Sequence, residues 1–133
     1  MSTPNLFRRE AETFVAMMRE LAPGLVLDFS PASIDALETW IHDGFDPPGS
    51  SHVGDMLVAG VGCYVGETVT RTLGGDWTAA GEVAGIGPID AVFPLAKSLK
   101  RFRRGERDSL VSYYDMIAET AGVVPADLVV TSA

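Results

Sequence analysis

The chain has 133 residues, of which 47% are hydrophobic and 21% charged, and its formal net charge is −8. This length and composition favour one globular domain over residues 1–133, with a core that needs no disulfide or metal, and they argue against disorder. A single cysteine, no apolar stretch near the roughly 18 residues of a membrane span and no signal-peptide pattern together predict a cytoplasmic protein. The acidity disfavours general nucleic-acid binding and favours a basic partner, or simply solubility.

Two helices are predicted in the N-terminal third. Thr3-Pro4 is typical of a cap followed by proline at the first helical position, and Pro23-Gly24 ends this helix. Its apolar positions recur at helical spacing: Leu6, Phe7, Phe14, Val15, Met18 and Leu21. Leu25–Phe29 is predicted to be a short strand or an extended link. Ser30-Pro31 repeats the cap signal, and the second helix has the apolar positions Ile34, Leu37, Trp40 and Ile41. Gly44–Ser50 is a loop, because it holds two prolines.

A third helix is predicted from Ser50 or Ser51 to about Leu73. On a helical wheel its surface divides into three sectors. One is bulky and apolar, and contains Leu57, Val61, Tyr64, Val65 and Thr68. A second holds only small residues, namely Ala59, Gly62, Cys63, Gly66 and Thr70. Glu67 and Arg71 lie together in the narrow polar sector between them. A helix that is apolar or small nearly all round is predicted to be central and buried.

Strands and two more helices follow. Gly74-Gly75 ends the third helix, and three short apolar runs predict an antiparallel meander: Trp77–Ala80, Val83–Ile86 and Ile89–Phe93. Pro94 begins a fourth helix that ends near Arg104. Asp108 or Ser109 caps a fifth helix, which Gly122 ends. The tail after Gly122 adds a last strand or frays. Helices, then strands, then helices predict an α+β fold.

The glycines at 60, 62 and 66 have two interpretations. A dinucleotide-binding turn needs G-x-G-x-x-G after a strand, and the spacing G-x-G-x-x-x-G does not fit it. Close packing of another element against the helix backbone explains the glycines better, since each of them costs about 1 kcal/mol relative to alanine in a helix. Cys63 lies among the small residues and is expected to be a buried thiol rather than a nucleophile.

Glu67 and Arg71 are the candidate site of the central helix. They stand four residues apart, so their side chains can form an ion pair that ties this helix to the meander. The alternative is a pocket between the central helix and the meander. There Glu67 acts as acid, base or anchor, while Arg71, Tyr64 and Trp77 supply charge and shape. Both interpretations remain open at the level of sequence.

The loop after the second helix carries a metal candidate. His42, His52 and Asp55 could act as ligands, with His52 and Asp55 on one helical face. Two histidines without a second anchored pair make a poor ligand set, however. Polar residues that solvate a loop and charge a helix start are the favoured interpretation, and we expect neither a metal nor any other cofactor.

Six of the ten basic residues fall between Lys97 and Arg107. Four of them share one side of the predicted fourth helix: Lys97, Lys100, Arg101 and Arg104. This side is the candidate contact for an anion or an acidic protein. The alternative is a solvated face that pairs with the chain's own excess of acid. No interleaved aromatic residues of the RNA-binding type accompany these cations.

The pattern G-x-Y-x-G-E-x-x-x-R-x-L-G-G-x-W runs from Gly62 to Trp77, and Phe93-Pro94, Lys100-Arg101, Gly105 and Asp108-Ser109-Leu110 follow it. Over roughly residues 52–121 the chain resembles a group of small bacterial, often actinobacterial, proteins of unknown function. The resemblance implies no activity and no site residue. It does imply that the Glu67/Arg71 helix and the Trp77 strand form one structural unit.

These observations favour a non-catalytic α+β protein that binds another protein, as an accessory, adaptor or immunity-like partner. The warrants are small size, strong acidity and the lack of a convincing catalytic constellation. The alternative function is an enzyme or a small-molecule binder with its pocket at Glu67 and Arg71. Oligomeric state does not follow from the sequence.

Overall fold

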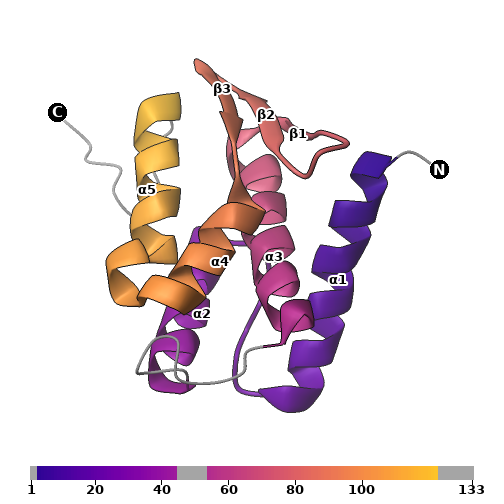
Figure 1. Ribbon diagram of the computed structural model, residues 1–133, viewed down its shortest axis with the longest axis vertical. Helices are drawn as coiled ribbons and strands as arrows, with labels where there is room; N and C mark the ends of the chain where they lie inside the picture. Colours follow the sequence, from indigo (N-terminus) through magenta and orange to yellow (C-terminus); the bar gives the residue numbers. More distant parts are fainter. Residues whose placement is uncertain (1–2, 45–53, 123–133) are drawn as a thin grey trace, which may run out of the picture.

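A computed structural model describes residues 3–44 and 54–122. In chain order its elements are α1 (Thr3–Leu21), α2 (Pro31–Gly44), α3 (Asp55–Leu73), β1 (Asp76–Trp77), β2 (Val83–Ile86), β3 (Ile89–Val92), α4 (Pro94–Arg104), the 3₁₀ turn η1 (Glu106–Asp108) and α5 (Leu110–Ala121). The predicted α+β fold is therefore confirmed, with helices at both ends of the order and a small meander between them (Figure 1).

Helix α3 is the centre of the molecule. Every residue from Gly60 to Val69 is buried, as the helical wheel predicted. Helices α1 and α4 flank α3 and make its most extensive contacts, while α2, α5 and the sheet also pack against it (Figure 1). The core around it contains Phe14, Met18, Ile34, Leu37, Tyr64, Trp77, Leu110 and Ile117 among others. A helix so enclosed has no broad polar face, because nearly every direction leads into protein.

Local capping explains where the helices begin and end. Ser30 Oγ accepts a hydrogen bond from the Ser33 amide at 3.1 Å, and Pro31 begins α2. Ser109, not Asp108, caps α5, because its side chain accepts from the amides of residues 111 and 112. Gly122 takes the left-handed conformation that ends α5. As described, α3 begins at Asp55 after Gly54. The predicted caps Ser50 and Ser51, and the tail after Gly122, lie outside the described residues.

The sequence-based interpretation of α1 needs one correction. Phe14 and Met18 are core residues as predicted, but the side chains of Leu6 and Leu21 are 48% and 67% exposed. Leu6 lies on the outer side of α1, since its neighbour Phe7 stacks on Trp77, and Leu21 is the last residue of the helix. The segment Leu25–Phe29 forms a link and no strand, and its last two residues lie in a bend rather than in extended backbone.

The predicted meander is confirmed as a three-stranded antiparallel sheet in the order β1-β2-β3. The bounds predicted for its first strand are wrong, because the strand is Asp76–Trp77, and Ala79 and Ala80 lie in a turn. Trp77 pairs with Val83, and Val83 in turn pairs with Val92. All three side chains are buried. The sheet contacts α3 through β1 and β2, so Trp77 is brought to the same region as Glu67.

Candidate functional site

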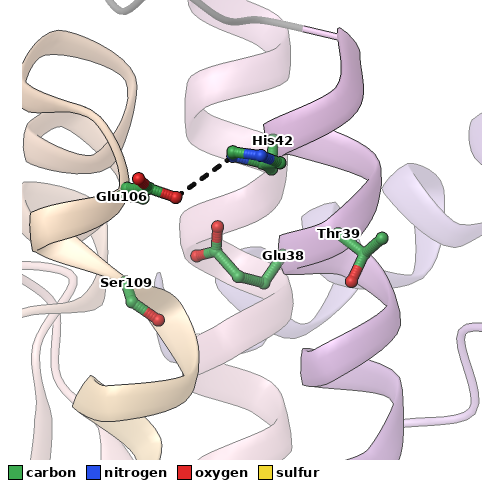
Figure 2. A pocket seen from close by; sticks show the side chains of 5 residues that line it. All are labelled: Glu38, Thr39, His42, Glu106 and Ser109. Carbon is green, nitrogen blue, oxygen red and sulfur yellow. Dashed lines mark ion pairs between the residues drawn. The ribbon is translucent and has the colours of Figure 1, made fainter.

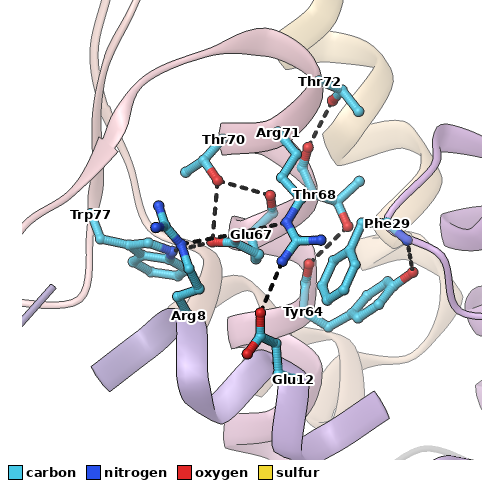
Figure 3. A network of polar contacts seen from close by, with 10 residues as sticks. All are labelled: Arg8, Glu12, Phe29, Tyr64, Glu67, Thr68, Thr70, Arg71, Thr72 and Trp77. Carbon is cyan, nitrogen blue, oxygen red and sulfur yellow. Dashed lines mark hydrogen bonds and ion pairs between the residues drawn. The ribbon is translucent and has the colours of Figure 1, made fainter. Parts of the chain in front are cut away.

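The carboxylate of Glu67 lies at the centre of a polar network, which we call the Glu67 network (Figure 3). Its side chain is only 1% exposed. Oε1 accepts hydrogen bonds from Trp77 Nε1 at 3.1 Å and from Thr70 Oγ1 at 3.2 Å. Oε2 accepts from Arg71 Nε at 2.7 Å and forms an ion pair with Arg8 Nε at 3.3 Å. A carboxylate buried without partners would be strongly unfavourable, so these donors make its burial possible.

Arg71 extends the network toward the link between α1 and α2. The Nη2 atom of Arg71 lies 3.3 Å from Glu12 Oε1, and its Cζ lies 3.8 Å from the centroid of the Phe29 ring. Phe29 has a φ of +60°, which is uncommon for a residue with a side chain. Tyr64 holds it there, because the hydroxyl accepts from the Phe29 amide at 2.9 Å and the two rings stack at 4.8 Å. Burial raises the pKa of Tyr64.

The small-residue side of α3 explains how Trp77 reaches Glu67. A Cβ on Gly66 would overlap the Trp77 ring and would lie 2.9 Å from Pro94 Cγ. A Cβ on Gly62 would lie 2.9 Å from the Leu95 backbone. Phe7 covers the other face of the indole, with the ring centroids 5.0 Å apart. The glycines therefore allow β1 and the start of α4 to approach the α3 backbone, which is the packing role that the sequence favoured.

The four residues predicted for a ligand site do come together, but each has its partners within the chain. Glu67 contacts both Arg71 and Trp77, and Phe29 links Tyr64 to Arg71. No buried side-chain nitrogen or oxygen of the described residues lacks a hydrogen-bond partner. The enzyme and small-molecule function at this site stays a prediction that no unsatisfied group supports.

Sequence reasoning missed the contribution of α1 to this network. Arg8 and Glu12 stand four residues apart on the exposed side of α1, and both reach the pair on α3. Their i, i+4 spacing was a signal for a charged stripe. It could not reveal the contact itself, since Glu12 and Arg71 are 59 residues apart in the sequence.

The basic side of α4 divides into buried and exposed charges. Arg101 is 4% exposed, and its guanidinium forms a fork with both oxygens of Glu38 on α2, which Nε approaches to 2.8 and 3.0 Å. Glu38 also accepts from the Leu110 amide at 2.8 Å. The prediction that Arg101 forms part of a surface contact is therefore wrong, because Arg101 is buried together with Phe102. Lys100 and Arg104 are exposed, and Lys97 pairs with Asp108 at 3.3 Å.

A pocket of about 270 Å³ opens beside these cations. Lys97 and Lys100 line it together with Phe93 and Tyr113, and its apolar floor comes from Ala91, Val92 and Ala96. Phe93 is 54% exposed, whereas burial raises the pKa of Tyr113 to about 12. The Tyr113 hydroxyl accepts from the Phe93 amide at 3.2 Å, and Lys97 Nζ lies 5.5 Å from the centroid of the Tyr113 ring. We call this feature the α4 pocket.

Two further candidates from the sequence, Cys63 and His42, lie away from the Glu67 network. Burial, and secondarily the charge of Glu10, raises the pKa of Cys63 to about 12, so the thiol is a poor nucleophile. His42 Nδ1 lies 3.3 Å from Glu106 Oε2 at a pocket of about 300 Å³ between α2 and η1 (Figure 2). His52 lies outside the described residues, so the metal candidate stays a prediction. Among the residues described, no three His, Cys, Asp or Glu side chains are arranged to hold a metal.

Within residues 3–44 and 54–122, no helix combines the length and the apolar character needed to cross a membrane. Comparison of the chain with known protein families, with curated proteins and with solved structures gives no match. The resemblance to small bacterial proteins therefore stays a prediction.

Proposed function

We propose that this chain is a non-catalytic protein-binding module that binds an acidic segment of its partner at the α4 pocket. The observation that carries the proposal is the exposed Phe93 ring beside Lys97 and Lys100, at the mouth of a pocket with an apolar floor. Aromatic side chains are enriched where proteins bind one another, and Phe93 is an exposed aromatic residue at this pocket. Lys100, which is exposed, would pair with a carboxylate of the partner, while the apolar residues of the pocket would take an apolar side chain.

The polar groups that could perform chemistry support the non-catalytic part of the proposal. Glu67 accepts hydrogen bonds from three groups of the chain itself and forms an ion pair with a fourth, and the Cys63 thiol is buried with a raised pKa. A general acid, base or nucleophile must reach its substrate within hydrogen-bond distance. Both groups instead serve the packing of α3 against its neighbours.

The test uses a labelled acidic peptide with one aromatic residue among several glutamates, and fluorescence anisotropy as the measurement. Lys100→Glu should weaken binding about tenfold, because it reverses a charge at the pocket. Phe93→Ser should weaken binding by a similar factor, about tenfold, because it removes an apolar contact. Both side chains are exposed, so the fold should survive either change.

Arg103→Glu is the matched control, since it makes the same change of charge on an exposed position of the same helix that does not line the pocket. It should leave most of the affinity. If Lys100→Glu and Arg103→Glu lose the same affinity for the peptide, the binding depends on the general charge of the helix and not on the pocket. Unchanged binding by Phe93→Ser, or no binding at all, would contradict the proposal.

A further inference from the structure

A second surface, formed by α1 and the start of α3, has the opposite charge. Its groove has a volume of about 260 Å³ and is lined by Glu10, Thr13, Phe14, Met17, Asp55, Met56, Ala59 and Gly60. We call it the α1–α3 groove. Met56 is 77% exposed, the largest exposed fraction among the large hydrophobic residues described. Neither the ion pairs of α4 nor the Glu67 network includes a residue of this groove.

Small residues form part of the lining of the groove. Ala59 and Gly60 present almost no side chain on α3, and the Phe14 ring fills the space beside Gly60. Met17 on α1 and Met56 on α3 form the two sides. Methionine has an unbranched, flexible side chain, and exposed methionines adapt to the apolar side chains of varied partners. The groove is thus an apolar surface that a helix or loop of a partner could cover.

The charges at the groove determine what kind of partner fits. Glu10 and Asp55 are the charged residues that line it, both are exposed, and no lining residue is basic. The net charge of −8 adds a long-range attraction for cations. Acidic residues beside an apolar groove complement a partner surface on which basic residues surround an apolar side chain.

We propose that the α1–α3 groove binds a basic amphipathic helix of a partner protein. One apolar side chain of that helix lies between Met17 and Met56, and lysines or arginines on the adjacent turns pair with Glu10 and Asp55. The lining residues Glu10 to Met17 span about two turns of α1, or roughly 10 Å, which suits two to three turns of a third helix packed into the groove between two. This mode is the familiar recognition of an amphipathic helix by a groove. It is independent of the α4 pocket.

The probe is a labelled synthetic peptide of about four helical turns, with leucine at helical spacing and lysine elsewhere. A scrambled peptide of the same composition and an acidic version with glutamate for lysine complete the set. We expect the amphipathic basic peptide to bind and to gain helicity by circular dichroism. The scrambled peptide should bind at least about tenfold more weakly, and the acidic one should not bind.

The variants separate this groove from general acidity. Met56→Ser should weaken binding about fivefold, and the double variant Glu10→Lys/Asp55→Lys should weaken it at least tenfold at low salt. Met116→Ser and the double variant Asp115→Lys/Glu119→Lys are the matched controls, because all three positions are exposed on α5 and none of them lines the groove. The controls should bind as the unmodified chain does.

Three results would overturn the proposal. One is equal binding of the scrambled peptide, since charge alone would then suffice. Another is an equal loss of affinity in the α5 controls. The third is a dimer in light scattering that Met56→Ser abolishes, because a second copy would then be the occupant. Thermal unfolding of each variant confirms that the fold is retained, and Met56→Ser keeps the test valid if the double variant unfolds.

Discussion

At the scale of single residues, the Glu67 carboxylate is a buried charge that joins three elements. Its donors come from three elements: Arg8 from α1, Thr70 and Arg71 from α3, and Trp77 from β1. Removing one partner from a buried charged pair costs more than the pair contributes, because the other charge is left without compensation. Glu67 therefore links the position of the sheet to that of α1.

Glu67→Gln tests this role. The amide keeps the shape of the carboxylate, but its NH₂ group must face either the Trp77 indole N–H or Arg71 Nε, and both are donors. We expect the free energy of unfolding to fall by about 2–4 kcal/mol, measured by urea denaturation. Arg8→Ala should cost less than about 1 kcal/mol, because that side chain is 54% exposed.

The relative stabilities of the Glu67→Gln and Arg8→Ala variants also bear on function. If Glu67→Gln destabilises no more than Arg8→Ala, the network is not the link that we describe. If Glu67→Gln stabilises the chain, the carboxylate is held at a cost, as functional groups often are. The ligand-site interpretation of Glu67 and Arg71 would then replace the structural one.

At the scale of elements, the position of β1 depends on how closely it can approach α3. Gly66 supplies that approach, since a side chain there would occupy the place of the Trp77 ring. The same contact lies beside Pro94 at the start of α4. One glycine thus adjusts the packing of both the sheet and the following helix against the central one.

Gly66→Ala should lower the free energy of unfolding by about 2–3 kcal/mol, since overpacking of the Trp77 ring outweighs the gain of about 1 kcal/mol in helix propensity. Gly44→Ala is the matched control. Gly44 is the last residue of α2, and a Cβ there would meet no atom within 4 Å. This control should be neutral or slightly stabilising in thermal unfolding. A stable Gly66→Ala variant with unchanged tryptophan fluorescence would contradict the close contact.

At the scale of the whole molecule, stability should fall at alkaline pH. Burial raises the pKa of the Cys63 thiol from 9.0 to about 12, and that of Tyr113 from 10.0 to about 12. Burial also raises the pKa of Tyr64 and of Tyr114. These protons leave the unfolded chain at lower pH than the folded one. Their stabilisation is therefore complete below the unfolded pKa values and is lost as pH rises toward the folded values.

Cys63→Ala isolates one of these groups. Between about pH 8 and about pH 10, the unmodified chain should lose roughly 1.4 kcal/mol more stability than the variant, because the pH exceeds the unfolded thiol pKa by about one unit. Urea denaturation at the two pH values measures this difference, and the tyrosines contribute equally to both proteins. An equal decline in both would show that the thiol is not held in its neutral form by burial.

The candidate site was predictable from the sequence only in part. The i, i+4 spacing placed Glu67 beside Arg71, and the resemblance implied one unit with Trp77. Arg8 could not be identified, because nothing local to α1 indicates which charge it will meet. The inward direction of Arg101 was also missed. A helical wheel assigns it to a basic side, whereas its partner Glu38 lies 63 residues away.

What the sequence by itself determined is the set of elements and their order. Capping residues, helix-ending glycines and prolines, and the apolar periodicity act within a turn or two. They therefore define the helices α1, α2, α4 and α5 and the presence of the meander without reference to the rest of the chain. The tertiary structure alone decided which side chains meet. The donors around Glu67, the burial of Arg101 and the two oppositely charged surfaces all arise where distant elements pack together, and that packing depends on the shape of the whole core.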